Sequence, residues 1–195
     1  MTSLRHNTQD AYLDAARACI LDVGWRRTTL TEVARRAGVS RMTIYRTWRD
    51  MAALLADLMT REWGALVDRV GTRLADTDLD EVEQLAEAVS ATVEALRANE
   101  LFIRIVELDP ELLLPYLLHR RGRSQDLVLA LVEDQVRRGQ EAGTVRTGAP
   151  AAIARGLVLA AHGFAFSSHT MVDDEVSEAD VDAELRELVR RAVRA

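Results

Sequence analysis

A short stretch near the start of the chain, "GVSRMTIYRTW", gathers side chains that could recognise nucleic acid. Arg41, Met42, Thr43, Tyr45 and Arg46 fall within six consecutive positions. An arginine can donate two hydrogen bonds to a guanine edge, and a threonine can contact a phosphate or the methyl group of a thymine. A tyrosine adds a hydroxyl that reaches phosphate or bases. This combination of side chains suits the major groove of double-stranded DNA.

The elements around this stretch have the pattern of two short helices joined by a tight turn. Apolar residues recur at helical spacing before the turn (Leu30, Val33) and after it (Ile44, Trp48). Thr29 or Thr31 can cap the first helix and Ser40 the second, and Gly38 ends the first. A separation of two residues is typical of a helix-turn-helix. The spacing alone leaves a second interpretation open, in which the polar residues form the solvated face of a small helical bundle.

A wider region, residues 9–58, resembles the DNA-binding domain of the TetR (tetracycline repressor) family of bacterial regulators. The resemblance rests on a first helix that ends at Gly24, on "TEVARRAGVS" for the second helix and turn, on "TIYR" in the third helix, and on an apolar fourth helix. It implies that Thr29 contacts phosphate. It also implies that the following residues face the groove or its walls: Arg41, Met42, Thr43, Tyr45, Arg46 and Thr47.

Two positions depart from the usual pattern of that family. Trp48 stands where phenylalanine is usual and is expected to be a bulkier core residue. Met51 stands where lysine is frequent, which removes one phosphate contact, and Arg49 is expected to replace it. Arg26 and Arg27 are further candidates for phosphate contacts.

The charge of the chain is divided unevenly between its two parts. The protein has 195 residues and a net charge of −6, and all 25 basic residues are arginines. Residues 1–52 contain nine arginines against five acidic residues, whereas the remainder contains 16 arginines against 26 acidic residues. We therefore expect a basic head that meets DNA and an acidic body that does not.

The chain as a whole reads as an all-α protein of nine or ten helices. We expect a helix-turn-helix DNA-binding domain in residues 1–52 and a helical ligand-binding and dimerisation bundle in residues 53–195. Asp50, Asn99, and Ser177 with Asp180 are predicted helix caps, Asp109 with Pro110 is predicted to start a helix, and Pro115 is predicted to kink it.

Other features of the composition argue for a cytoplasmic protein without a cofactor. The single cysteine, Cys19, cannot form an internal disulfide or a multi-cysteine metal site. The first residues lack the apolar stretch of a signal peptide, and we expect no apolar run to reach the roughly 20 residues of a membrane span.

The resemblance also implies a ligand cavity and a dimer interface in the body. The candidate cavity residues are mostly apolar, which favours a hydrophobic or amphipathic small molecule, although residues of these types are more often plain core than ligand contacts: Trp63, Leu66, Val89, Val93, Phe102, Val106, Leu113, Tyr116, Gln135 and Phe166. Gly156 and Gly163, seven residues apart, would let two helices approach closely, and Leu131 of the preceding helix would complete a four-helix interface. Arg155, His162 and His169 share the same spacing and favour a polar stripe over a metal site.

These features predict a homodimeric, one-component repressor that binds an inverted-repeat operator and is released by a small molecule. A ligand-independent regulator or an activator with the same head is the nearest alternative. A helical enzyme and a pure protein-interaction module belong to other classes. The first lacks a visible acid–base or nucleophile cluster, and salt-sensitive DNA binding would separate the second from a regulator.

Overall fold

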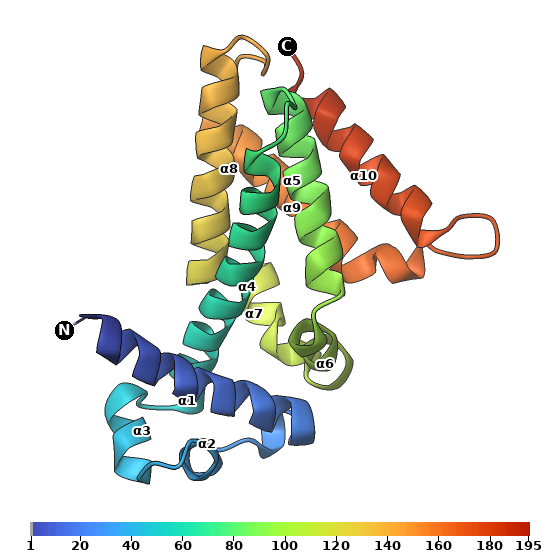
Figure 1. The fold of residues 1–195 in the computed structure, drawn as a ribbon. Coiled ribbons are helices and arrows are strands. Elements are labelled where there is room, and N and C mark those ends of the chain that lie inside the picture. Colours follow the sequence, from blue (N-terminus) through green and yellow to red (C-terminus); the bar gives the residue numbers. More distant parts are fainter. Residues whose placement is uncertain (1) are drawn as a thin grey trace. The chain divides into compact units, whose positions relative to one another are not determined.

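The computed structural model describes the backbone of residues 2–195 and the side chains of residues 8–195. Within that part, the chain forms ten α-helices, three short 3-10 helices and no strand, apart from an isolated bridge between Val145 and Arg194 (Figure 1). The elements are α1 (Thr2–Val23), η1 (Trp25–Arg27), α2 (Leu30–Arg36), α3 (Arg41–Thr47), α4 (Met51–Ala75), α5 (Glu81–Arg97), α6 (Glu100–Leu108), η2 (Pro110–Leu112), α7 (Leu114–Leu118), α8 (Arg123–Glu141), α9 (Pro150–Ser167), η3 (Ser168–Thr170) and α10 (Glu178–Val193). The predicted all-α class is confirmed.

The helices form two compact units. Unit 1 contains residues 1–62 and 98–123, and unit 2 contains residues 63–97 and 124–195. Unit 1 is therefore larger than the predicted DNA-binding domain, because it includes the first half of α4 together with α6 and α7. The predicted boundary after residue 52 concerns function and stays a prediction.

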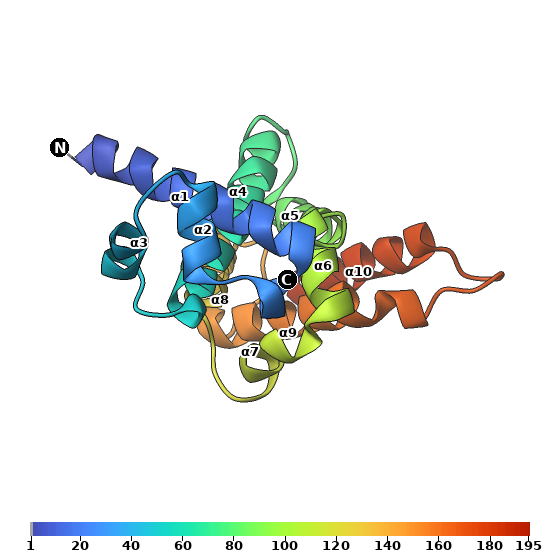
Figure 2. The same cartoon turned by 90° about the horizontal axis from the view of Figure 1, so that it is seen from below.

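The core of unit 1 holds the first three helices together. Ile20 of α1, Val33 of α2 and Ile44 of α3 are fully buried in one apolar cluster with Leu54 and Leu58 of α4. Figure 2 shows α1, α2 and α3 side by side, with α6 against α1. Val23, the last residue of α1, is 43% exposed and lies outside this cluster.

Local capping signals explain where four of the helices begin. Thr29 Oγ1 accepts a hydrogen bond from the backbone N–H of Glu32, and Ser40 Oγ accepts one from Thr43. Asn99 caps α6 through two backbone N–H groups, and Ser177 forms the expected capping box at the start of α10. Each such cap satisfies donors that the first turn of a helix leaves unpaired.

One prediction about the middle of the chain is confirmed and one is wrong. Asp109 with Pro110 starts the short 3-10 helix η2, although the Asp109 carboxylate does not bond to that helix and instead accepts a hydrogen bond of 3.0 Å from the backbone N–H of Trp25. Pro115 does not kink a helix, because it lies in the first turn of a separate helix, α7, where its missing N–H has no intrahelical partner to lose.

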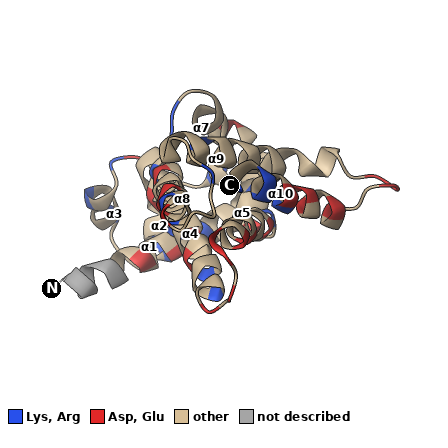
Figure 3. Ribbon diagram, turned by 90° about the horizontal axis from the view of Figure 1, so that it is seen from above, with Lys and Arg blue, Asp and Glu red and all other residues tan. Residues whose placement is uncertain are grey.

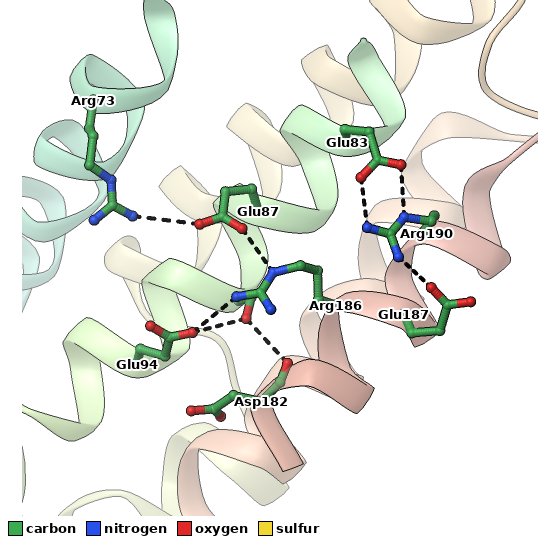
Figure 4. Close-up of polar contacts among 9 residues, drawn as sticks. Arg73, Glu83, Glu87, Glu94, Asp182, Arg186, Glu187 and Arg190 are labelled. Carbon is green, nitrogen blue, oxygen red and sulfur yellow. Dashed lines mark hydrogen bonds and ion pairs between the residues drawn. The ribbon is translucent and has the colours of Figure 1, made fainter. Parts of the chain in front are cut away.

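Unit 2 is built mainly from α5, α8, α9 and α10. Its core includes Leu85, Val136 and Leu185, which are all fully buried. A row of ion pairs joins α5 to α10 (Figure 4). Arg190 contacts Glu83 at 2.7 Å, Arg186 contacts Glu87 at 2.8 Å, and at the other end Arg97 of α5 makes two hydrogen bonds of 2.6 Å to Asp182 of α10.

The connection between α8 and α9 packs closely against the end of the chain. The backbone N–H of Arg146 donates to the carbonyl oxygen of Val193, and the N–H of Ala195 donates to Thr144. Gly139 of α8 faces Val145 so closely that an added Cβ would lie 2.3 Å from a methyl group of Val145. This approach therefore requires glycine.

Helix α9 departs from the sequence expectations in two respects. Together with η3 it forms the segment Pro150–Thr170, one helix in the described part of the chain that is long and apolar enough, by length and composition alone, to cross a membrane. The expectation that no apolar run reaches this length was therefore wrong. His169 lies in η3 and not on α9, so the predicted polar stripe with Arg155 and His162 does not continue to it.

Candidate nucleic-acid interface

Helix α3 presents the predicted recognition residues on its outer face. Ile44 is fully buried and Trp48 is 2% exposed, so they attach the helix to the core of unit 1. Met42 is 61% exposed and Tyr45 is 46% exposed on the opposite side. Arg41, Arg46 and Thr47 are also exposed, whereas Thr43 is half-buried.

The hydroxyl groups of this region are partly engaged within the helices. Thr43 Oγ1 lies 3.0 Å from Ser40 Oγ, and Thr47 Oγ1 donates to the carbonyl oxygen of Thr43 at 3.3 Å. Thr29 is exposed while it caps α2, which places it beside the unpaired backbone N–H groups of that helix start. A helix N-terminus with free N–H groups is a general anion site, so Thr29 is well placed for a phosphate.

The arginines of unit 1 separate into those that have an acidic partner and those that do not. Five head arginines are paired: Arg17 with Glu62 at 3.3 Å, Arg26 with Glu111 at 2.7 Å, Arg35 with Glu32 at 2.5 Å, Arg36 with Asp22 at 2.6 Å and Arg49 with Asp50 at 3.0 Å. Among residues whose side chains are described, Arg27, Arg41 and Arg46 have no acidic partner within 4.0 Å. Basic positions on α3 are visible in Figure 3.

Two of the predicted phosphate contacts are therefore less available than the sequence indicated. The hydrogen bond to Glu111 raises the pKa of Arg26 and lowers the pKa of Glu111, so this pair stays fully charged at neutral pH. Arg49 bonds to the neighbouring Asp50, which also caps α4 through the N–H of Ala53. An acidic partner close to an arginine reduces the attraction of that arginine for a phosphate.

One polar contact next to the recognition helix was not foreseen. The indole N–H of Trp48 donates a hydrogen bond of 2.7 Å to the carboxylate of Asp57 on α4. Trp48 is thus more than a bulkier core residue. The sequence indicated this contact, because Trp48 stands where phenylalanine is usual. A buried indole has an N–H donor that phenylalanine lacks, and that donor needs a hydrogen-bond partner.

The predicted ligand-binding residues are divided between the two units. Phe102, Val106, Leu113 and Tyr116 lie in unit 1, and the other six lie in unit 2. Val89 and Val93 belong to the apolar core of unit 2, and Phe166 packs against the same cluster. Trp63 and Gln135 are half-buried. A shared cavity formed by these residues stays a prediction.

The predicted dimer residues lie on exposed surfaces of α8 and α9. Gly156 and Gly163 are exposed, and an added Cβ at either would meet no atom within 4 Å. Leu131 is 41% exposed, and Leu159, between the two glycines, is 70% exposed.

Among the described residues, no group of three or more histidine, cysteine or acidic side chains could hold a metal ion.

The chain is similar in sequence to known bacterial regulators. The profile for "Bacterial regulatory proteins, tetR family" matches residues 13–58. An uncharacterised HTH-type transcriptional regulator of Mycobacterium bovis, Mb2274c, is 32% identical over 185 residues, which cover 95% of this chain and 94% of that protein.

Two solved structures have the same fold at low sequence identity. The R. erythropolis transcriptional repressor QsdR, from the TetR family, has a TM-score of 0.70 and 14% identity, with 97% of each chain covered. RolR in complex with resorcinol also has a TM-score of 0.70 and 14% identity, with 99% of this chain and 90% of that chain covered.

The short helix pair α2–α3, the exposed basic face of α3 and the helical body define a helix-turn-helix transcriptional regulator. Together with the profile match and the mycobacterial relative, they identify the family. The chain belongs to the TetR family of bacterial regulatory proteins.

Proposed function

We propose that the protein is a homodimeric, one-component transcriptional repressor. Each protomer places α3 in the major groove of one half of an inverted-repeat operator. A small, hydrophobic or amphipathic molecule binds the helical body and releases the protein from DNA. The protein acts in the cytoplasm, where its operator is.

The outer face of α3 is the observation that carries the DNA-binding part of this proposal. Arg41 and Arg46 project from it without an acidic partner among the described side chains, and Tyr45 is exposed between them. Arginines in this position can read guanine, while the start of α2 at Thr29 contacts the backbone. The buried pair Ile44 and Trp48 keeps the face directed outward.

The dimer and the ligand rest on separate observations. The exposed apolar surface of α8 and α9, with Leu131 and Leu159 beside Gly156 and Gly163, has the character of an unpaired four-helix interface. RolR, a protein of the same fold, was solved with resorcinol, and QsdR is described as a repressor. Release by a ligand requires a coupling free energy of about 1–3 kcal/mol between the two sites.

Selection of bound fragments from genomic DNA by the purified protein tests this proposal. The expected product is a set of sites with two-fold symmetry whose half-site centres lie about one helical turn, or a multiple of it, apart. No enrichment of any sequence, or enrichment of sites without two-fold symmetry, would contradict it. A parallel selection with Tyr45→Ala separates sequence recognition from general attraction to DNA, because the variant keeps every arginine.

A further inference from the structure

The side chain of Trp48 holds the end of the recognition helix in one position. The indole is 2% exposed and meets the ring of Tyr12 edge-on, with ring centroids 6.3 Å apart and an interplanar angle of 77°. Its Nε1–H donates to Oδ2 of Asp57 at 2.7 Å. Trp48 is also the C-cap of α3 in extended conformation, so the helix ends at the residue that is held.

The carboxylate of Asp57 collects donors from three different elements. Besides Trp48, Oδ2 accepts from Nε2 of Gln9 on α1 at 3.3 Å. Oδ1 accepts from the guanidinium of Arg123, the first residue of α8. The side chain of Asp57 is only 23% exposed, and the positive charge of Arg123 offsets the cost of its partial desolvation. Hydrogen bonds to an ionised acceptor are stronger than neutral ones.

We propose that Asp57 is a positioning residue for sequence recognition by α3. Its Oδ2 fixes the C-terminal end of α3 through Trp48, and Arg123 fixes the carboxylate itself through Oδ1. This inference rests on the proposed insertion of α3 in the major groove. Helix α3 has only seven residues, and its buried attachments are Ile44 and the Trp48 cap, so the loss of one attachment lets its outer face shift.

A shift of α3 affects the two classes of DNA contact differently. Hydrogen bonds to base edges require a defined position, whereas attraction between arginines and phosphates tolerates small displacements. Loss of the Asp57 contact should therefore lower affinity for the operator and leave affinity for unrelated DNA nearly unchanged. A general loss of folded protein would instead lower both affinities by the same factor.

The test measures affinity for the selected operator and for a scrambled duplex of equal length, by fluorescence anisotropy. Trp48→Phe, which keeps an aromatic ring and removes the N–H, and Asp57→Leu should each lower the operator-to-scrambled affinity ratio about tenfold. Asp57→Asn keeps an acceptor for the indole and should retain most of the ratio. Asp68→Asn, an exposed aspartate further along α4, is the matched control and should change nothing.

Two further measurements keep the result interpretable. The double variant Trp48→Phe/Asp57→Leu should have the same ratio as either single variant, because both remove the same hydrogen bond. The signal of the Trp48 indole N–H in a ¹H–¹⁵N spectrum is identified by its absence in Trp48→Phe. Its chemical shift should change in Asp57→Asn and in Arg123→Gln. Unchanged ratios in both single variants, or additive losses in the double variant, would overturn the inference. Failure of the unmodified protein to select any DNA would instead overturn the proposed function.

Discussion

The number of unpaired arginines predicts how steeply DNA binding depends on salt. Arg27, Arg41 and Arg46 have no acidic partner among the described side chains of the head, which gives three per protomer and six in a dimer. Each of these cations displaces counterions from the DNA, whether it lies against a phosphate or reaches a guanine edge. At about −0.9 per charge, the slope of log affinity against log salt concentration should be about −5. Affinity should then fall roughly a thousandfold between 50 and 200 mM salt.

Substitution of single arginines tests the assignment of these three residues. Arg46→Gln removes two cations from the dimer and should change the slope from about −5 to about −3.5. Arg35→Gln is the matched control: Arg35 is exposed and lies on α2, but it bonds to Glu32 at 2.5 Å, so the slope should stay near −5. The assay is fluorescence anisotropy with a labelled operator over a salt series. Equal slopes for both variants, or a slope near zero for the unmodified protein, would refute the distinction between paired and unpaired arginines.

Four further predictions address recognition, assembly and stability. Tyr45→Ala should weaken operator binding by roughly 1–3 kcal/mol in a gel-shift titration without a change in the circular dichroism spectrum. Gly163→Arg should convert a sedimenting dimer to monomer, whereas Gly71→Arg, at an exposed and open position of α4, should not; a dimer that persists in both would exclude this part of α9 from the interface. Gly139→Ala should lower the free energy of unfolding in urea by about 1–3 kcal/mol, because its Cβ would lie 2.3 Å from Val145, and Gly71→Ala should not lower it. The hydrogen bond from Arg190 holds the pKa of Glu83 below its ordinary value of 4.5, so its contribution to stability is fully present above pH 4.5 and is lost as the pH falls through the lowered pKa; the stability difference between the unmodified protein and Glu83→Gln should therefore narrow as the pH falls below 4.5.

Features that depend on neighbouring residues were predictable from the sequence. The caps at Thr29, Ser40, Asn99 and Ser177 each act on a backbone N–H two or three residues later, so the signal and its effect lie within one turn. The outward face of α3 follows from the same local periodicity.

Features that depend on distant partners were not predictable. Asp109 starts η2 as the sequence predicts, but its carboxylate bonds to the backbone of Trp25, 84 residues away, which no local pattern indicates. Arg26 reads as a free cation, but Glu111 neutralises it from a part of the chain that is equally distant. The local sequence indicates which hydrogen bonds or ion pairs a side chain can form within its own segment. Which of them it forms depends on the residues that the tertiary fold brings next to it.

The ion pairs between α5 and α10 also specify how these two helices are aligned. Along most of the row the acids lie on α5 and the arginines on α10, but at the last pair the signs are exchanged: Arg97 is on α5 and Asp182 on α10. If α10 slid by one turn in one direction, Asp182 would approach Glu87; in the other direction, Arg186 would approach Arg97. Either slip would place like charges together. The row therefore also rejects misaligned packings of the two helices that the apolar residues alone would tolerate.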